Sequence, residues 1–140
     1  MFTTLELPDL RGCLPISICD LSRITLLVGK NGVGKTRVLD AVRSENVVAL
    51  DNIEHGVHHT GMVEMWRHWL SLACGHDLQI FATTHSWECI VAFATALDGQ
   101  PPGSGVVIRL ECEPGWEHMG AVVIDQEKLP YVVRDCIEIR

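Results

Sequence analysis

The residues with the clearest chemical potential in this chain form one glycine-rich segment. Its eight positions match the spacing G-x-x-x-x-G-K-[ST] and are Gly29, Lys30, Asn31, Gly32, Val33, Gly34, Lys35 and Thr36. Backbone N–H groups in such a turn can surround phosphate oxygens, while the lysine reaches the outer phosphates. The threonine hydroxyl is of a type that ligates Mg²⁺. The segment therefore predicts a polyphosphate site with Mg²⁺, and the basic side chain of Arg37 follows it directly.

The elements on either side of this segment have the patterns needed to hold it. The run 24–28 (Ile-Thr-Leu-Leu-Val) is continuously apolar, as expected for a central parallel strand that is covered on both faces. Apolar residues at helical spacing predict a helix over about 34–44. Such a helix would direct the positive end of its dipole toward the bound anion.

Two further apolar runs end in polar residues that could join the same site. The run 47–50 ends at Asp51, and a carboxylate in that place can sit beside Mg²⁺ and its water shell. The run 78–84 ends at His85, and Ser86 can cap a helix over about 87–97. Ligands of open α/β sheets bind at the carboxyl ends of parallel strands, which favours a role for His85. The alternative for His85 is an ordinary polar group at the sheet edge.

The remaining segments predict a single α/β domain over residues 1–140. Alternating residues within 3–12 and 14–19 indicate an antiparallel pair of strands with a turn at Arg11–Gly12. An amphipathic helix is expected over 60–74, with its apolar stripe packed in the core. A hairpin over 106–110 and 121–124, a short helix near 126–134 and a strand at 136–139 complete the chain. The expected fold is a mostly parallel sheet flanked by helices, with antiparallel strands added at both ends.

Composition and charge narrow the classes of partner. A net charge of −7 argues against broad nucleic-acid binding, which needs a basic surface. No stretch has the length and apolar character of a membrane helix, so we expect a cytosolic protein without a membrane partner. The six cysteines have no C-x-x-C spacing, which indicates reduced, mostly buried thiols. His55, His58 and His59 match no standard metal-site spacing and are interpreted as loop structure.

Three pieces of the sequence together resemble a known family. They are the Leu-Arg-Gly strand pair ahead of the glycine-rich segment, Leu-Asp-Asn-Ile-Glu-His-Gly-Val-His at 50–58, and Ile-Phe-Ala-Thr-Thr-His-Ser at 80–86. They are similar to the ABC-type, AAA-like ATPases related to RecF, SMC and OLD proteins, over nearly the whole chain. The resemblance implies a P-loop NTPase fold that binds ATP and Mg²⁺. It also implies that Lys35 and Thr36 act in the P-loop, that Asp51 is the Walker B carboxylate and that His85 senses the γ-phosphate.

The chain departs from that family in two places. Only residues 37–50 separate Thr36 from Asp51, where the family has a Q-loop, a helical lobe and the signature motif. A homodimer could therefore not close its sites in the usual way. The chain could use a partner protein that supplies the missing lobe, a different homo-oligomer, or no closing partner. Asn52 stands where the family usually has the Glu that activates water, and Asn cannot accept a proton. Glu54 is the nearest substitute, and on an extended segment it would share the side of Asn52. The alternative for Glu54 is a solvated loop acid or an acid that caps a helix.

These observations support three hypotheses for the function. The first is a slow Mg²⁺-dependent ATPase in which Lys35 and His85 stabilise the phosphoryl group and Glu54 or Asn52 positions water. The second is a nucleotide-dependent switch that hydrolyses little and acts on a partner protein. The third is a small P-loop kinase, against which stands the lack of an Arg-rich lid segment.

Overall fold

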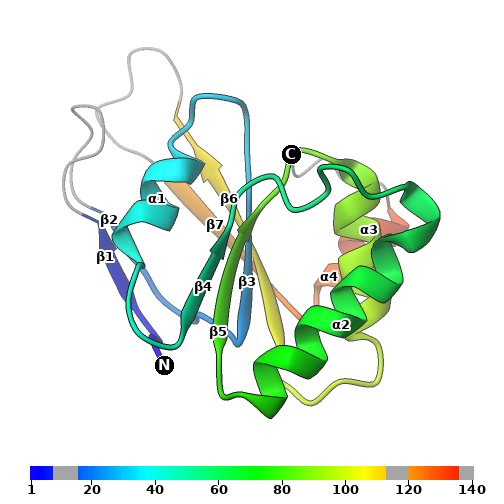
Figure 1. Ribbon diagram of the computed structural model, residues 1–140. Coiled ribbons are helices and arrows are strands. Elements are labelled where there is room, and N and C mark those ends of the chain that lie inside the picture. The colour runs from blue at the N-terminus through cyan, green and yellow to red at the C-terminus, as the bar shows by residue number, and fades with distance from the viewer. Residues whose placement is uncertain (8–15, 113–119, 136–140) are drawn as a thin grey trace.

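The computed structural model describes residues 1–7, 16–112 and 120–135, and its centre is a five-stranded sheet (Figure 1). The strands lie in the order β4-β5-β3-β6-β7. Their bounds are β3 (Ile24–Val28), β4 (Val47–Leu50), β5 (Gln79–Thr83), β6 (Gly105–Glu111) and β7 (Gly120–Asp125). The first four are mutually parallel, and β7 pairs antiparallel with β6. The predicted α/β class, the mostly parallel sheet and the antiparallel hairpin are confirmed.

The amino-terminal strands form a sheet of their own. β1 (Leu5–Leu7) and β2 (Ile16–Ile18) pair antiparallel, as predicted, but they make a separate two-stranded sheet. The prediction that they extend the central sheet is therefore wrong. Their apolar residues Leu5, Leu7 and Ile18 pack instead in a core cluster over one face of that sheet. The predicted turn at Arg11–Gly12 and the predicted strand at 136–139 lie outside the described residues.

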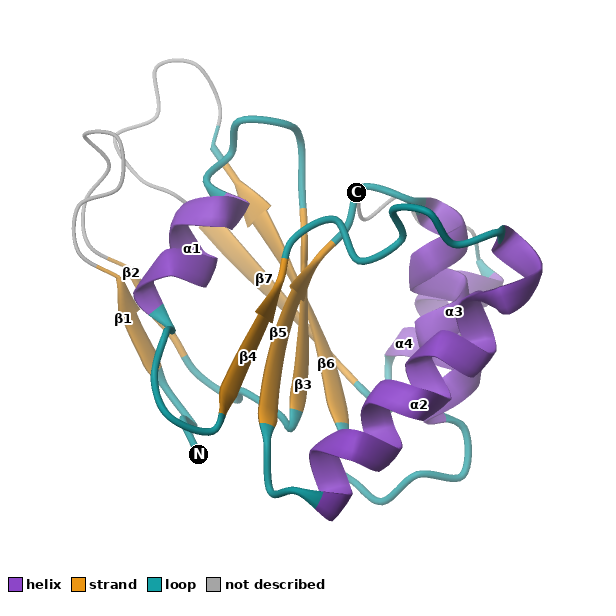
Figure 2. Cartoon of the chain, in the orientation of Figure 1, coloured by secondary structure: helices purple, strands orange, loops and turns teal. Residues whose placement is uncertain are grey.

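The helices cover the two faces of the central sheet (Figure 2). α1 (Lys35–Ala41) lies with β1 and β2 on one face, while the other face carries α2 (Met62–Gly75), α3 (Trp87–Leu97) and α4 (Leu129–Arg134). A short 3₁₀ turn, η1 (His59–Gly61), precedes α2. Within the described ranges, no helix is both long and apolar enough to cross a membrane.

α1 is shorter than predicted because the chain turns early toward β4. The helix ends at Ala41 rather than near residue 44. Asn46 then adopts a φ of 63°, and its carbonyl accepts a hydrogen bond from the Gln79 backbone at 2.9 Å. This turn sets the start of β4 at Val47, beside β5. With only two helical turns, α1 supplies less of the dipole that the sequence predicted at the phosphate site.

β3 contributes side chains to two hydrophobic clusters, one on each face of the central sheet. Both of its edges are paired with other strands, and both of its faces are covered. All five of its residues are buried. Ile24, Leu26 and Val28 pack toward α2 and α3, whereas Leu27 packs toward α1. This alternation follows the two-residue period of a strand. The end of β3, where the glycine-rich loop begins, is therefore fixed by packing on both faces of the sheet.

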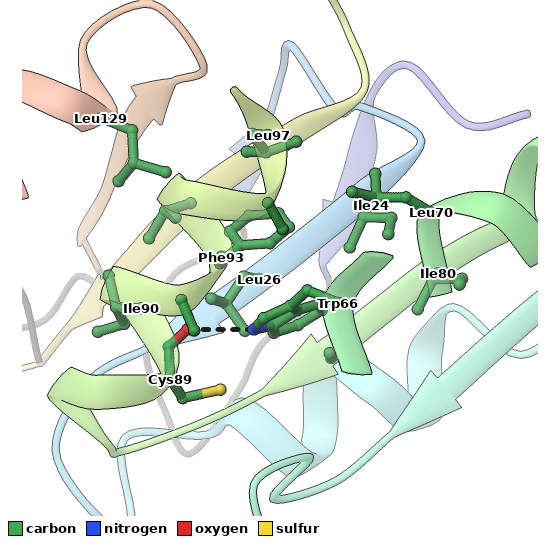
Figure 3. Packing of buried hydrophobic residues seen from close by; sticks show 14 of the residues in the cluster. Ile24, Leu26, Trp66, Leu70, Ile80, Cys89, Ile90, Phe93, Leu97 and Leu129 are labelled. Atoms are coloured by element: carbon green, nitrogen blue, oxygen red, sulfur yellow. Dashed lines mark hydrogen bonds between the residues drawn. The ribbon is translucent and has the colours of Figure 1, made fainter. Parts of the chain in front are cut away.

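The apolar stripe of α2 is core packing, as predicted, and Trp66 is its centre (Figure 3). The indole is fully buried, and its Nε1 donates a hydrogen bond to the Cys89 carbonyl at 3.1 Å. Its ring lies 4.5 Å from that of Phe93, centroid to centroid. Trp66 thus anchors the start of α3, which directly follows His85 and Ser86. Ser86 caps α3 as predicted, because its hydroxyl accepts a hydrogen bond from the Cys89 N–H.

The cysteines are less buried than expected. Cys89 is fully buried, and burial raises the pKa of its thiol to about 11, so it stays protonated at neutral pH. Cys19, Cys74 and Cys112 are exposed. The prediction of mostly buried thiols is therefore wrong for the part of the chain that the structure describes.

Candidate functional site

The carboxyl ends of three neighbouring parallel strands meet at one edge of the sheet. β3 lies between β5 and β6, and β4 pairs with the outer side of β5. The glycine-rich loop (residues 29–34) follows β3, Asp51 follows β4, and Thr84 and His85 follow β5 (Figure 1). Segments far apart in the sequence are therefore brought to one place by strand pairing alone, as the sequence predicted.

The glycine-rich loop begins at a backbone position that only glycine can occupy without strain. Gly29 has a φ of 148°, and a Cβ there would lie 2.6 Å from the carbonyl oxygen of Leu110 in β6. Gly32 and Gly34 also have positive φ values, of 79° and 112°. Val33 is buried and packs in the hydrophobic cluster beneath the loop. The loop is thus a tightly curved backbone held close to the sheet edge.

The side chain of Lys35 is folded against this loop. Its Nζ donates to the carbonyl of Gly29 at 2.5 Å and to that of Lys30 at 3.2 Å. Burial lowers the pKa of Lys35 from its ordinary value of 10.5, and the charges of Asp51 and Glu54 partly oppose that shift. A phosphate would offer the ammonium charged acceptors in place of these neutral carbonyls.

Asp51 lies between two hydroxyl groups. Its Oδ2 is 3.4 Å from the Thr36 hydroxyl, which is the contact expected of a shared metal site. Its Oδ1 accepts a hydrogen bond from the Thr83 hydroxyl at 2.5 Å. Thr83 is not among the site residues predicted from the sequence. The available signal was a threonine at the end of an otherwise apolar strand, one strand away from the carboxylate.

A cavity of about 330 Å³ opens over these groups. It is lined by Asn31, Gly32, Gly34, Lys35, Thr36, Arg37, Asp51 and Asn52. Most of the residues predicted for phosphate and metal binding therefore line one cavity, whereas Gly29, Lys30 and Val33 do not. A larger cavity of about 1080 Å³ lies at the opposite end of the sheet, near the start of β6, and includes none of these residues.

The donor atoms in the smaller cavity suit Mg²⁺ and phosphate. Mg²⁺ prefers oxygen ligands and keeps several water molecules, so a hydroxyl and one carboxylate from the protein are enough. Across the described residues there is no group of three His, Cys, Asp or Glu side chains placed to hold a metal ion.

Glu54 and His85 form a second group at the same edge. The Glu54 Oε1 lies 3.2 Å from the His85 Nδ1 and 3.5 Å from the His85 backbone nitrogen. The Glu54 side chain is 12% exposed and that of His85 is 60% exposed. The other carboxylate oxygen of Glu54 is buried and makes no hydrogen bond. Glu54 is therefore a largely buried carboxylate with one free oxygen, and the interpretation as a solvated loop acid is wrong.

The segment that joins Asp51 to Glu54 is a turn and not the extended segment predicted. Asn52 adopts a φ of 48°, and its carbonyl accepts a hydrogen bond from the His55 N–H at 2.9 Å. The turn separates the two candidates for positioning water. Asn52 is exposed and lines the cavity, whereas Glu54 turns toward His85.

The three histidines that follow belong to the loop structure, as interpreted from the sequence. The His58 Nδ1 accepts a hydrogen bond from the Thr60 N–H and caps η1. Its ring lies 4.1 Å from that of His59. All three side chains belong to exposed residues.

Comparison with known proteins does not place this chain in a family. It matches no protein-family model and no curated protein.

Proposed function

We propose that this protein binds ATP with Mg²⁺ at the carboxyl edge of its sheet and hydrolyses it slowly. The observation that carries the proposal is the contact between the Thr36 hydroxyl and the Asp51 carboxylate, 3.4 Å apart, beside the buried Lys35 ammonium. Two oxygen ligands for a metal thus adjoin a cation and a curved glycine backbone, which together suit a polyphosphate. The choice of ATP among nucleotides rests on the family resemblance.

Thr36 and Asp51 would hold the metal, and the glycine-rich loop with Lys35 would hold the phosphates. Bound Mg²⁺ supplies charge neutralisation for the phosphate oxygens. Lys35 adds a second positive charge where negative charge develops during transfer of the γ-phosphoryl group. Arg37 and Lys30 are exposed beside the loop and add to the positive field that attracts the anion.

Glu54 is the group best suited to activate water. Asn52 cannot accept a proton, whereas Glu54 carries a carboxylate whose Oε1 lies beside the exposed His85 ring. In this proposal His85 contacts the outermost phosphate, while its Nδ1 faces the Glu54 carboxylate. A neutral imidazole that donates through Nδ1 has only an acceptor at Nε2, so donation to a phosphate as well requires the doubly protonated ring.

The proposal is tested by Lys35→Ala, with Lys128→Ala as the matched control. Both changes remove one lysine, but Lys128 is exposed and pairs with Asp125 at 3.0 Å, away from the site. We expect Lys35→Ala to abolish measurable ATP binding in calorimetry and to abolish phosphate release, and Lys128→Ala to match the wild type. Phosphate release by Lys35→Ala at the wild-type rate would contradict the proposal.

A nucleotide-dependent switch is the second candidate, because the site is open. Asn31, Thr36, Arg37 and Asp51 are exposed. Within the described ranges no element covers these four residues, so a partner protein or a second copy could close the site. Under the ATPase proposal, Glu54→Gln slows phosphate release by about 10²-fold or more. If neither Glu54→Gln nor Asn52→Glu changes an already negligible rate, the switch is favoured. Phosphate transfer to an added nucleotide that outpaces hydrolysis would instead favour a kinase.

A further inference from the structure

Thr83 holds three consecutive residues at the end of the neighbouring strand. Its hydroxyl donates to the Asp51 Oδ1 at 2.5 Å and accepts from the Asn52 N–H at 2.8 Å. Its carbonyl accepts from the Ile53 N–H at 3.0 Å. Thr83 is fully buried at the last position of β5. The whole turn that carries Asp51 is thus fastened to one rigid residue of the sheet.

The directions of these hydrogen bonds are determined by chemistry. A backbone N–H can only donate, so the Thr83 hydroxyl must accept from Asn52. Its single proton is then available for Asp51, whose ionised carboxylate can only accept. One oxygen of Asp51 is thereby occupied, and the other is left facing the Thr36 hydroxyl. The carboxylate is oriented before any ligand arrives.

Without this contact, Asp51 has a competing partner. The residue is exposed, so solvent leaves its side chain free to rotate, and its charge acts on the Lys35 ammonium. A carboxylate that turned to pair with Lys35 would remove both a metal ligand and a phosphate-binding cation from the site. The Thr83 hydroxyl opposes that rearrangement through a short, charge-assisted hydrogen bond.

We propose that Thr83 is a positioning residue that orients the Asp51 carboxylate and thereby sets how strongly Mg²⁺ enhances nucleotide binding. The inference rests on the proposed ATP site, but it concerns the coupling between metal and nucleotide rather than binding itself. Groups that orient a metal ligand commonly change metal affinity by about 10–100-fold when they are removed.

The test is equilibrium ATP binding by calorimetry, with Mg²⁺ and with EDTA, in wild type, Thr83→Val, Thr83→Ser and Thr25→Val. We expect Thr83→Val to lose about tenfold or more of the enhancement by Mg²⁺ while its affinity in EDTA stays that of the wild type. Thr83→Ser keeps the hydroxyl and should restore the enhancement. Thr25→Val is the matched control, because Thr25 is equally buried in the same sheet and its hydroxyl has no hydrogen-bond partner.

The outcomes separate this inference from the proposed function. A wild-type protein that binds no ATP under either condition contradicts the proposed function itself. If the wild type binds ATP with a Mg²⁺ enhancement that Thr83→Val retains, the inference about Thr83 is overturned. Should Thr83→Val not fold, Thr83→Ser decides: loss of the enhancement despite its hydroxyl overturns the inference, and wild-type enhancement together with loss in Thr83→Ala supports it.

Discussion

Gly29 joins the central strand to the glycine-rich loop, and its backbone tolerates no side chain. A Cβ at this position would lie 2.6 Å from the Leu110 carbonyl oxygen, which belongs to the backbone of β6 and cannot move aside. The φ of 148° is also one that residues with a side chain rarely adopt. The close approach of two strands therefore determines this residue type, independently of any ligand.

We expect Gly29→Ala to destabilise the fold by on the order of 2 kcal/mol or more, because strain and steric overlap add. Gly75→Ala is the control, since Gly75 lies within α2 and a Cβ there meets nothing within 4 Å. That variant should be stabilised by up to about 1 kcal/mol through its better helix propensity. Urea denaturation measures both free energies of unfolding, and equal effects of the two substitutions would contradict the geometry.

Lys35 makes the proposed nucleotide binding sensitive to alkaline pH. Because burial lowers its pKa below 10.5, the ammonium loses its proton at a lower pH than an ordinary lysine. Phosphate prefers the charged form, so ATP affinity should be constant near neutral pH and fall as the pH rises through the lowered pKa, by up to about tenfold per pH unit. Calorimetry across this range measures the slope. Lys35→Arg keeps its charge throughout, and an identical slope in that variant would argue against Lys35 as the titrating group.

Among the elements, β3 has all five residues buried, and one of them carries a polar side chain without a hydrogen-bond partner. Thr25 lies between Phe81 of β5 and Val106 of β6, and its hydroxyl is buried without a hydrogen-bond partner. Burying an unpaired hydroxyl costs free energy, so Thr25→Val, which has nearly the same shape, should stabilise the protein by about 1 kcal/mol. Thermal unfolding measures the change, and a clearly lower melting temperature for this variant would mean that the hydroxyl is bonded in solution.

At the scale of the whole molecule, the candidate site faces solvent because the segment between Thr36 and Asp51 is short. Residues 37–50 form only the rest of α1, a turn and β4, and leave no segment to reach a nucleotide on a second copy. We therefore expect phosphate release per protomer to be independent of protein concentration, and the mass in solution to stay the same when ATP and Mg²⁺ are added. Light scattering with a phosphate assay measures both quantities. A doubling of mass with ATP would contradict this prediction and indicate that a dimer closes the site.

The site as a set of residues could be predicted from the sequence because its signals are local. Apolar runs that end in Gly29, Asp51 and His85 identify three strand ends, and parallel pairing must bring such ends to one edge. The path of the turn after Asp51 could not be predicted, because hydrogen bonds to β5 shape it. The extended segment expected there was wrong for that reason.

What the sequence by itself determined was the set of elements and the residues that gather at the carboxyl edge, since both follow from spacing and from the period of apolar residues. Only the tertiary structure decided how those residues face one another. The pairing of Glu54 with His85, the hydroxyl of Thr83 on Asp51 and the separate sheet of β1 and β2 each join positions distant in sequence or depend on side-chain rotamers. Such contacts are selected by packing of the whole chain, because no local pattern distinguishes one orientation of a carboxylate from another.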